Sequence, residues 1–268
     1  MALPKEMFVV DEQLISDIRD NPHYEDLARD FELVDIRDIK SSKTLQVKDG
    51  GKVVPLSDYN KKGHLVQSEC YLNTYYPLFE YANNAYEELA GLMNKLCNFM
   101  GDNVKFECEI YEESLDTSQS NHSQSINGGF SYKLFDANAE YKSSNSQQTS
   151  SQNGRWITFS ASVGNAKKTP KELKNYIEQN HINLHALPVS FRALVETYLQ
   201  SPNAKLKSYE RQEDTLKQAS KCTQRCKKFS ANVSYLPIFK AEFGMDLSDE
   251  TNFSHKVQTK IRHAVSFE

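Results

Sequence analysis

Side chains that could bind a metal ion occur as two pairs with helical spacing. Cys222 and Cys226 are four residues apart, as are His181 and His185, so each pair would share one face of a helix. Two ligands make only half of a metal site, and the histidine pair lacks the glutamate of a zinc-protease motif. We interpret the histidines as residues that cap or follow a helix, and the cysteines as a reduced pair near a basic surface. The sequence predicts no metal and no cofactor.

Motifs for catalysis do not occur in the sequence. It contains no Gly-x-x-x-x-Gly-Lys, no Gly-x-Gly-x-x-Gly and no Gly-x-Ser-x-Gly. Glu112 and Glu113 are adjacent, so on a strand they would point to opposite faces and could not act together as acid and base. Cys108 and His122 could pair as nucleophile and base, but no local motif supports them. The sequence favours a protein that is not an enzyme, and a catalytic site assembled from distant residues stays open.

Positive charge gathers in one segment of an otherwise acidic chain. The net charge is −4, yet residues 164–228 hold 13 basic and 6 acidic side chains. One interpretation is a solvated face that pairs with the acidic N-terminal region, and the other is contact with lipid headgroups. Nucleic acid is a disfavoured partner, because the chain as a whole is acidic and Phe229 alone offers a ring for stacking. The candidates for contact with an anionic surface are Lys217, Lys221, Arg225, Lys227 and Lys228.

Helices are predicted where apolar residues recur at three and four. Asp11 is the expected cap of a short helix near the N-terminus, and Asp-Gly-Gly at 49–51 predicts a turn between two extended runs. Apolar residues between 71 and 100 predict a long helix that Pro77 starts or kinks and Gly101 ends. Thr169, Pro170 and Glu172 form a helix start, and a further helix is expected at about 189–200.

Strands are predicted where apolar residues occupy every second position. This pattern covers residues 104–110, 130–141 and 156–163, with polar connections at 114–129 and 143–153. It returns at 239–247 and 257–267, which are expected to form a long amphipathic hairpin with a turn at 248–252. The fold class is therefore α+β, an antiparallel sheet with long amphipathic hairpins packed against helices.

The predicted organisation has two parts. Residues 1–60 form an N-terminal helical and extended segment. Residues 61–268 form an α+β domain with helix 71–100, strands 103–163, helices 169–200 and hairpin 229–268.

The predicted hairpin has the dimensions of a membrane β-hairpin. Such strands are about 9–11 residues long, with apolar side chains toward lipid and polar ones toward a wet lumen. In order of its elements, the stretch 71–268 resembles the gasdermin and perforin-type pore-forming proteins. The resemblance implies a latent monomer that self-associates on a membrane and extends two hairpin regions into a β-barrel. It rests on element order, so no residue role is carried over. The candidates for lipid contact are Phe239, Phe243, Met245, Val257 and Ile261.

The function expected from these patterns is that of a latent, pore-forming protein that inserts β-hairpins into an anionic membrane. Alternatives are a non-enzymatic partner-binding or scaffold protein, and an enzyme whose site is not visible as a motif. The five cysteines fit no disulfide framework, and the sequence shows neither a secretory signal nor a spanning run of apolar residues. We therefore expect a cytoplasmic protein, which the pore-forming hypothesis recruits to a membrane.

Overall fold

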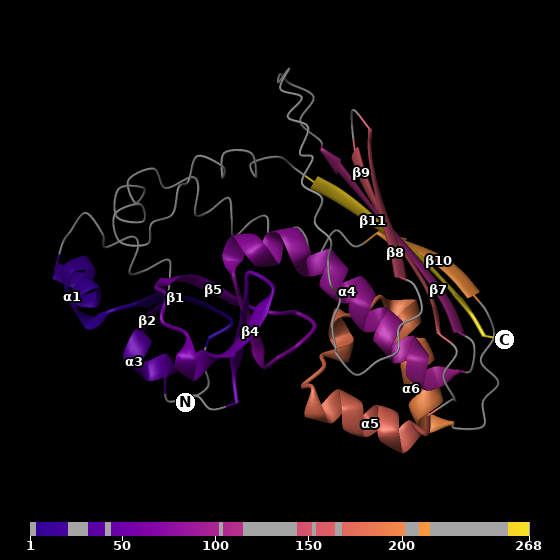
Figure 1. Ribbon diagram of the computed structural model, residues 1–268, viewed down its shortest axis with the longest axis horizontal. Helices are drawn as coiled ribbons and strands as arrows, with labels where there is room; N and C mark the ends of the chain where they lie inside the picture. The colour runs from indigo at the N-terminus through magenta and orange to yellow at the C-terminus, as the bar shows by residue number, and fades with distance from the viewer. Residues whose placement is uncertain are drawn as a thin grey trace. The chain divides into compact units, whose positions relative to one another are not determined.

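The computed structural model describes residues 4–20, 32–40, 44–101, 104–114, 144–151, 154–163, 168–201, 209–214 and 257–267. They belong to two compact units, each containing helices and strands (Figure 1). The first unit holds the described residues up to Tyr86 together with Asn175–Leu187, and the second holds those of Glu87–Lys174, Pro188–Leu216 and His255–Glu268. The predicted α+β class is confirmed.

A mixed six-stranded sheet forms the first unit, with the order β2-β1-β5-β6-β3-β4. β1 runs parallel to β2 and β3 runs parallel to β6, while the other neighbours are antiparallel. The predicted boundary at residue 60 falls within this sheet, since β1 pairs with β5 across that position. The strands are β1 Glu6–Val10, β2 Leu33–Asp35, β3 Gln46–Asp49, β4 Lys52–Pro55, β5 Gly63–Gln67 and β6 Thr74–Pro77.

One face of the six-stranded sheet carries the main apolar core of this unit. Every residue of the core is buried below a tenth of its surface, so the sheet is held by burial of apolar area as well as by its hydrogen bonds. Helix α1, Glu12–Asp20, buries Leu14 and Ile18, and the Asp11 carboxylate accepts from the N–H of Leu14, which confirms the predicted cap. The core consists of Met7, Val9, Val34, Ile39, Val47, Leu56, Tyr59, Leu65 and Tyr75.

The turn between β3 and β4 confirms the Asp-Gly-Gly prediction. Gly50 and Gly51 have φ angles of 58° and 74°, in the left-handed region where a side chain would be strained. Two such residues in succession form the tight hairpin turn whose twist matches that of the flanking strands.

The predicted helix 71–100 begins later than expected. Residues Thr74–Pro77 form β6, and α4 covers Leu78–Met100. The prediction was wrong for 71–77, because Tyr75 and Tyr76 alternate between the two faces of the sheet and both are buried there, as suits aromatic residues in a strand. Pro77 stands directly before the helix, a position it tolerates because α4 needs no hydrogen bond from its nitrogen.

A five-stranded antiparallel sheet forms the second unit, with the order β10-β11-β7-β9-β8. In β7 the side chains of Val104, Phe106 and Cys108 are buried while Lys105 and Glu107 are exposed, which confirms the predicted alternation. The predicted strand at 130–141 lies outside the described residues. The strands are β7 Val104–Ser114, β8 Ser144–Ser151, β9 Gly154–Val163, β10 Tyr209–Asp214 and β11 Val257–Ser266.

β8 occupies part of the polar stretch 143–153 that the sequence predicted as a connection. That prediction was wrong, because eight residues of the stretch pair continuously with β9. Serine, asparagine and glutamine carry little strand preference of their own, and pairing with an existing strand overrides that preference here.

Gly101, at the end of α4, is required by a close approach. A β-carbon at this position would lie 2.8 Å from Cδ1 of Phe267 and 2.9 Å from Cγ2 of Val104. The glycine was predicted as the stop of the helix, and α4 does end at Met100. Its φ is not in the left-handed region. Glycine is needed here because a side chain would clash with Phe267 and Val104, not because of the backbone conformation.

Two further helices and their ends complete the described elements. α5, Pro170–Gln179, begins with the predicted capping box: Thr169 Oγ1 accepts from the N–H of Glu172, and the Glu172 carboxylate accepts from the Thr169 N–H at 2.7 Å. α6 covers Val189–Gln200 and buries Phe191, Val195 and Tyr198. The remaining short helices are α3 Ile36–Ile39, η2 Leu56–Asp58 and η3 Leu184–Ala186.

Candidate functional site

The predicted lipid-contact residues fall mostly outside the described part of the chain. Phe239, Phe243 and Met245 lie there, as do residues 229–256 of the predicted hairpin. Val257 and Ile261 lie in β11, opposite Ser114 and Ile110 of β7. The sequence paired this strand with 239–247, whereas the structure places it between β7 and β10.

His263 and Val265 of β11 lie on the same face of the strand as Val257 and Ile261, and this end of the strand packs against α6. His263 and Val265 expose 0% and 2% of their surface. The His263 ring meets Phe191 of α6 edge-on at 6.0 Å, and Phe191 also meets Phe106 of β7 at 6.4 Å. In this form of the protein, helix packing accounts for the apolar side chains at this end of the strand.

Ser190 and His263 form a serine–histidine contact in the second unit. The Ser190 hydroxyl and the His263 Nε2 are 3.4 Å apart. A serine hydrolase needs this pair at a surface that substrate can reach. His263 has no exposed surface and lies under Phe191, so the contact is part of the packing between α6 and the sheet.

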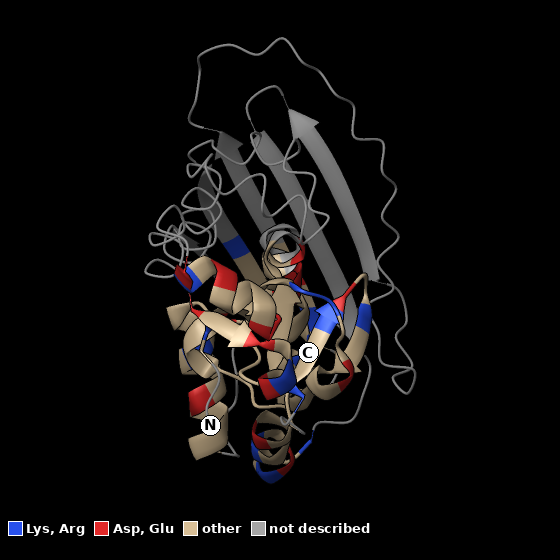
Figure 2. Ribbon diagram, turned by 90° about the vertical axis from the view of Figure 1, so that its left-hand side faces the viewer, with Lys and Arg blue, Asp and Glu red and all other residues tan. Residues whose placement is uncertain are grey.

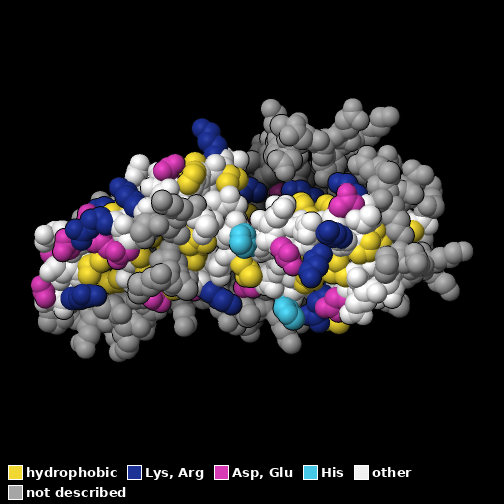
Figure 3. All heavy atoms as spheres, turned by 90° about the horizontal axis from the view of Figure 1, so that it is seen from below, with side chains coloured by type: hydrophobic (Ala, Val, Ile, Leu, Met, Phe, Trp, Pro, Cys, Tyr) yellow, Lys and Arg dark blue, Asp and Glu magenta, His cyan; other side chains and the backbone are white. Residues whose placement is uncertain are grey.

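The basic candidates Lys217, Lys221, Arg225, Lys227 and Lys228 also lie outside the described residues. Along the ribbon of the described elements in Figure 2, positions of lysine and arginine are interspersed with those of aspartate and glutamate. On the face shown in Figure 3, apolar atoms are likewise broken up by polar and charged side chains. The described residues on the face shown in Figure 3 therefore offer no broad patch of a single kind.

A cluster of ionisable side chains, unforeseen from the sequence, surrounds the β3–β4 turn. Lys61 Nζ lies 2.6 Å from Asp49 Oδ2, and the Glu80 carboxylate at the start of α4 accepts from the N–H of Gly50. Burial raises the pKa of the Glu80 carboxyl, and the charge of Asp49 raises it further. Burial, followed by the charges of Asp49 and Glu80, also raises the pKa of Tyr59. Perturbed groups of this kind mark active sites, but they also mark structural clusters.

The cluster joins a turn to a helix and has few groups left for chemistry. Asp49 is held by Lys61 and by a hydrogen bond with Tyr59, and Glu80 is held by the turn. Within the described ranges, no three His, Cys, Asp or Glu side chains come close enough to hold a metal ion. We assign the cluster a structural role.

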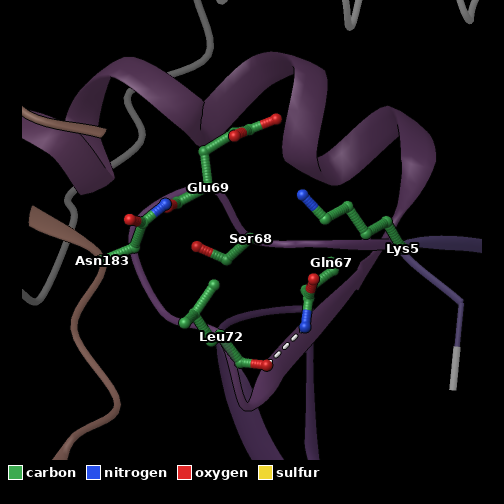
Figure 4. Close-up of a pocket in the computed structure, with 6 residues that line it drawn as sticks. All are labelled: Lys5, Gln67, Ser68, Glu69, Leu72 and Asn183. Atoms are coloured by element: carbon green, nitrogen blue, oxygen red, sulfur yellow. Dashed lines mark hydrogen bonds between the residues drawn. The ribbon is translucent and has the colours of Figure 1, made fainter. Parts of the chain in front are cut away.

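A shallow hollow in the first unit is lined by Lys5, Gln67, Ser68, Glu69, Leu72 and Asn183 (Figure 4). It has room for about one water molecule. Its polar groups are engaged in holding the loop: Ser68 Oγ accepts from the N–H groups of Cys70 and Tyr71, and Asn183 Nδ2 donates to the Glu69 carbonyl at 2.9 Å. The hollow therefore lies where the 68–73 loop packs against the segment after α5.

The structure describes only one of the two possible metal-ligand pairs found in the sequence. Cys222 and Cys226 lie outside the described residues. His181 follows the end of α5 with a φ of 50°, and His185 is the middle residue of η3, so the two histidines do not share a helix face. The interpretation of His181 as a residue that follows a helix is confirmed.

Comparison with known proteins gives no family for this chain. No protein-family model, no curated protein and no solved structure matches it. None of the helices among the described residues has the length and apolar composition to span a bilayer.

Proposed function

We propose that this protein acts on anionic membranes, and that the five-stranded sheet is the frame from which a β-hairpin enters the bilayer. Three neighbouring strands have the length of membrane β-strands, because β7 has 11 residues and β9 and β11 have 10 each. Their pairing is antiparallel and unbroken over ten positions on both sides of β7. A frame of this length can be extended without a change of register.

The observation that carries the proposal is the register of β10 with β11. Tyr209 stands opposite Val265 and Asp214 stands opposite Lys260, so the residues between the two strands would continue this pairing toward a tip at Pro237. Over residues 229–245 of this continuation, apolar residues stand opposite apolar residues at every second pair. The matched apolar pairs are Phe229 with Met245, Ala231 with Phe243, Val233 with Ala241, and Tyr235 with Phe239.

The intervening polar positions also match in this register. They bring Asn232 opposite Glu242 and Ser234 opposite Lys240, as the wet side of a membrane hairpin requires. The basic candidates between 217 and 228 come directly before Phe229, the first residue of the matched apolar pairs. In this position lysine and arginine would meet anionic headgroups. The residues involved lie outside the described ranges, and the pairing is proposed for the membrane-bound form.

Dye release from anionic and neutral vesicles tests the proposal, with sedimentation to follow binding. We expect leakage that salt suppresses, from anionic vesicles only, with full-length or gently proteolysed protein. Phe243→Asp should reduce leakage at least roughly tenfold, because a charge on the lipid side of a strand is costly. The matched control, Ser234→Asp, places the same charge on the polar side and should leak like the unchanged protein.

The second candidate function is a non-enzymatic partner-binding protein. It is favoured by the burial of His263 and Val265 under α6, because a sheet packed on helices also alternates apolar and polar residues. If neither the intact nor the proteolysed protein binds vesicles or releases dye from them, the membrane proposal is rejected in favour of this function. Equal leakage by the Phe243→Asp and Ser234→Asp variants would reject the proposed register.

A further inference from the structure

Three of the four sheet edges carry features that discourage pairing with another chain. β2 has three residues and runs directly into α3. β4 has four residues and ends at Pro55, which has no N–H group. β10 holds Glu210, Arg211, Glu213 and Asp214 within six residues. Short length, proline and charge are the usual protections of an exposed edge strand.

β8 carries none of these protections. Its eight residues, Ser-Asn-Ser-Gln-Gln-Thr-Ser-Ser, include no charge and no proline. It pairs with β9 position by position, from Ser144 opposite Ala161 to Ser151 opposite Gly154, with no bulge to twist the edge away. In the part of the chain that the structure describes, no strand pairs with its other side.

The outer side of β8 presents a regular row of backbone groups. Ser151 and Gly154 close a hairpin with two residues between them, and in such hairpins the closing pair exchanges both hydrogen bonds. Every second residue pair along the two strands also exchanges both of its backbone hydrogen bonds. The residues in between therefore direct their N–H and C=O groups to the open edge, and they are Ser144, Ser146, Gln148 and Ser150.

We propose that β8 is a dimerisation strand that pairs antiparallel with β8 of a second copy of this chain. An antiparallel strand is complementary to itself across a two-fold axis, and two uncharged strands do not repel each other. Pairing of β8 with β10 of another copy is disfavoured for two reasons. β10 is charged, and since both strands run in the same direction in the sheet, a head-to-tail copy would pair them in the weaker parallel arrangement.

The charged edge also stops further growth. After β8 has paired, the edges of the joined sheet are the two β10 strands, which carry acidic side chains. Edge-to-edge addition therefore ends at two copies and does not lead to a fibre. This inference does not depend on the proposed membrane activity, because dimerisation is measured without lipid.

Sedimentation equilibrium of the full chain over a wide concentration range tests the inference. We expect a dimer of the 30.7 kDa chain. The double variant Gln147→Lys, Thr149→Lys places like charges at the joint, on the sheet face that bears the exposed Lys105 and Glu107, and should weaken the dimer by roughly tenfold or more. Gln148→Pro removes an outer N–H group without adding charge and should have the same effect.

The matched control adds the same two charges away from β8. Gln212→Lys with Gln258→Lys lies on β10 and β11 and should leave the dimer unchanged. Circular dichroism and the melting temperature must show that each variant is folded. A wild-type chain that stays monomeric at its highest concentration overturns the inference, as does a dimer that survives both β8 changes, or growth beyond two copies.

Discussion

At the scale of single residues, Glu80 shows how a perturbed carboxylate arises from topology. β3 and β6 run parallel, so the turn after β3 and the helix after β6 meet at the same end of the sheet. This places Asp49 and Gly50 beside Glu80, although thirty residues separate the turn from the helix. No spacing rule links these positions in the sequence, and for this reason the cluster was not predicted.

Replacement of Glu80 by glutamine should make stability less dependent on pH. Burial raises the folded-state pKa of this carboxyl, so its contribution to stability is present below the unfolded pKa and is lost as pH rises through the folded pKa. Glutamine keeps an acceptor for the Gly50 N–H without the charge. We expect Glu80→Gln to be at least as stable as wild type at pH 7, with the advantage shrinking at pH 4.

Urea unfolding at both pH values measures this difference. The matched variant Glu80→Ala removes the acceptor and should be about 1 kcal/mol less stable than Glu80→Gln at both pH values. A glutamine variant that is clearly less stable than wild type at pH 7 would show that the negative charge itself holds the turn.

At the scale of elements, α5 has one end that was predicted and one that was not. Its start follows from Thr169, Pro170 and Glu172, a local pattern that needs no tertiary contact. Its end is a Schellman motif, in which Ile182 N–H donates to the Ile177 carbonyl and His181 N–H donates to the Glu178 carbonyl. The usual glycine of this motif is replaced by His181 at a φ of 50°, so the sequence carried no stop signal there.

His181→Gly should stabilise the first unit. A β-carbon in the left-handed region costs about 1–2 kcal/mol, and part of the gain is offset by the greater freedom of glycine in the unfolded chain. We expect a net gain of roughly 0.5–1 kcal/mol in the free energy of unfolding. His185→Gly is the matched control, because His185 lies in η3 outside the left-handed region and should gain nothing. Equal effects of the two changes in thermal unfolding would contradict this account.

At the scale of the whole molecule, charge should govern membrane attraction. The chain carries a net charge of −4 at pH 7 and has a pI of about 6.0. Below the pI the net charge of the chain becomes positive. The net charge therefore opposes attraction of the basic segment to an anionic membrane at neutral pH and adds to it in mild acid.

Binding to anionic vesicles should accordingly rise several-fold between about pH 7.5 and pH 5, and fall again with added salt. Co-sedimentation measures the bound fraction, with neutral vesicles as the control. Binding that changes with neither pH nor salt would show that charge does not bring the chain to the membrane. Apolar insertion would then be the source of affinity.

The sequence by itself determined the α+β class, the Asp-Gly-Gly hairpin, both predicted caps and the alternation of β7, because each depends on residues within a few positions of one another. Tertiary structure alone decided which strands are neighbours. β11 lies beside β7 and β10, Thr74–Pro77 joins a sheet and does not begin a helix, and the polar β8 becomes a strand because β9 offers it a complete partner. Strand pairing is a contact between distant segments, and the energy of each such pairing depends on the partner as much as on the strand's own residues.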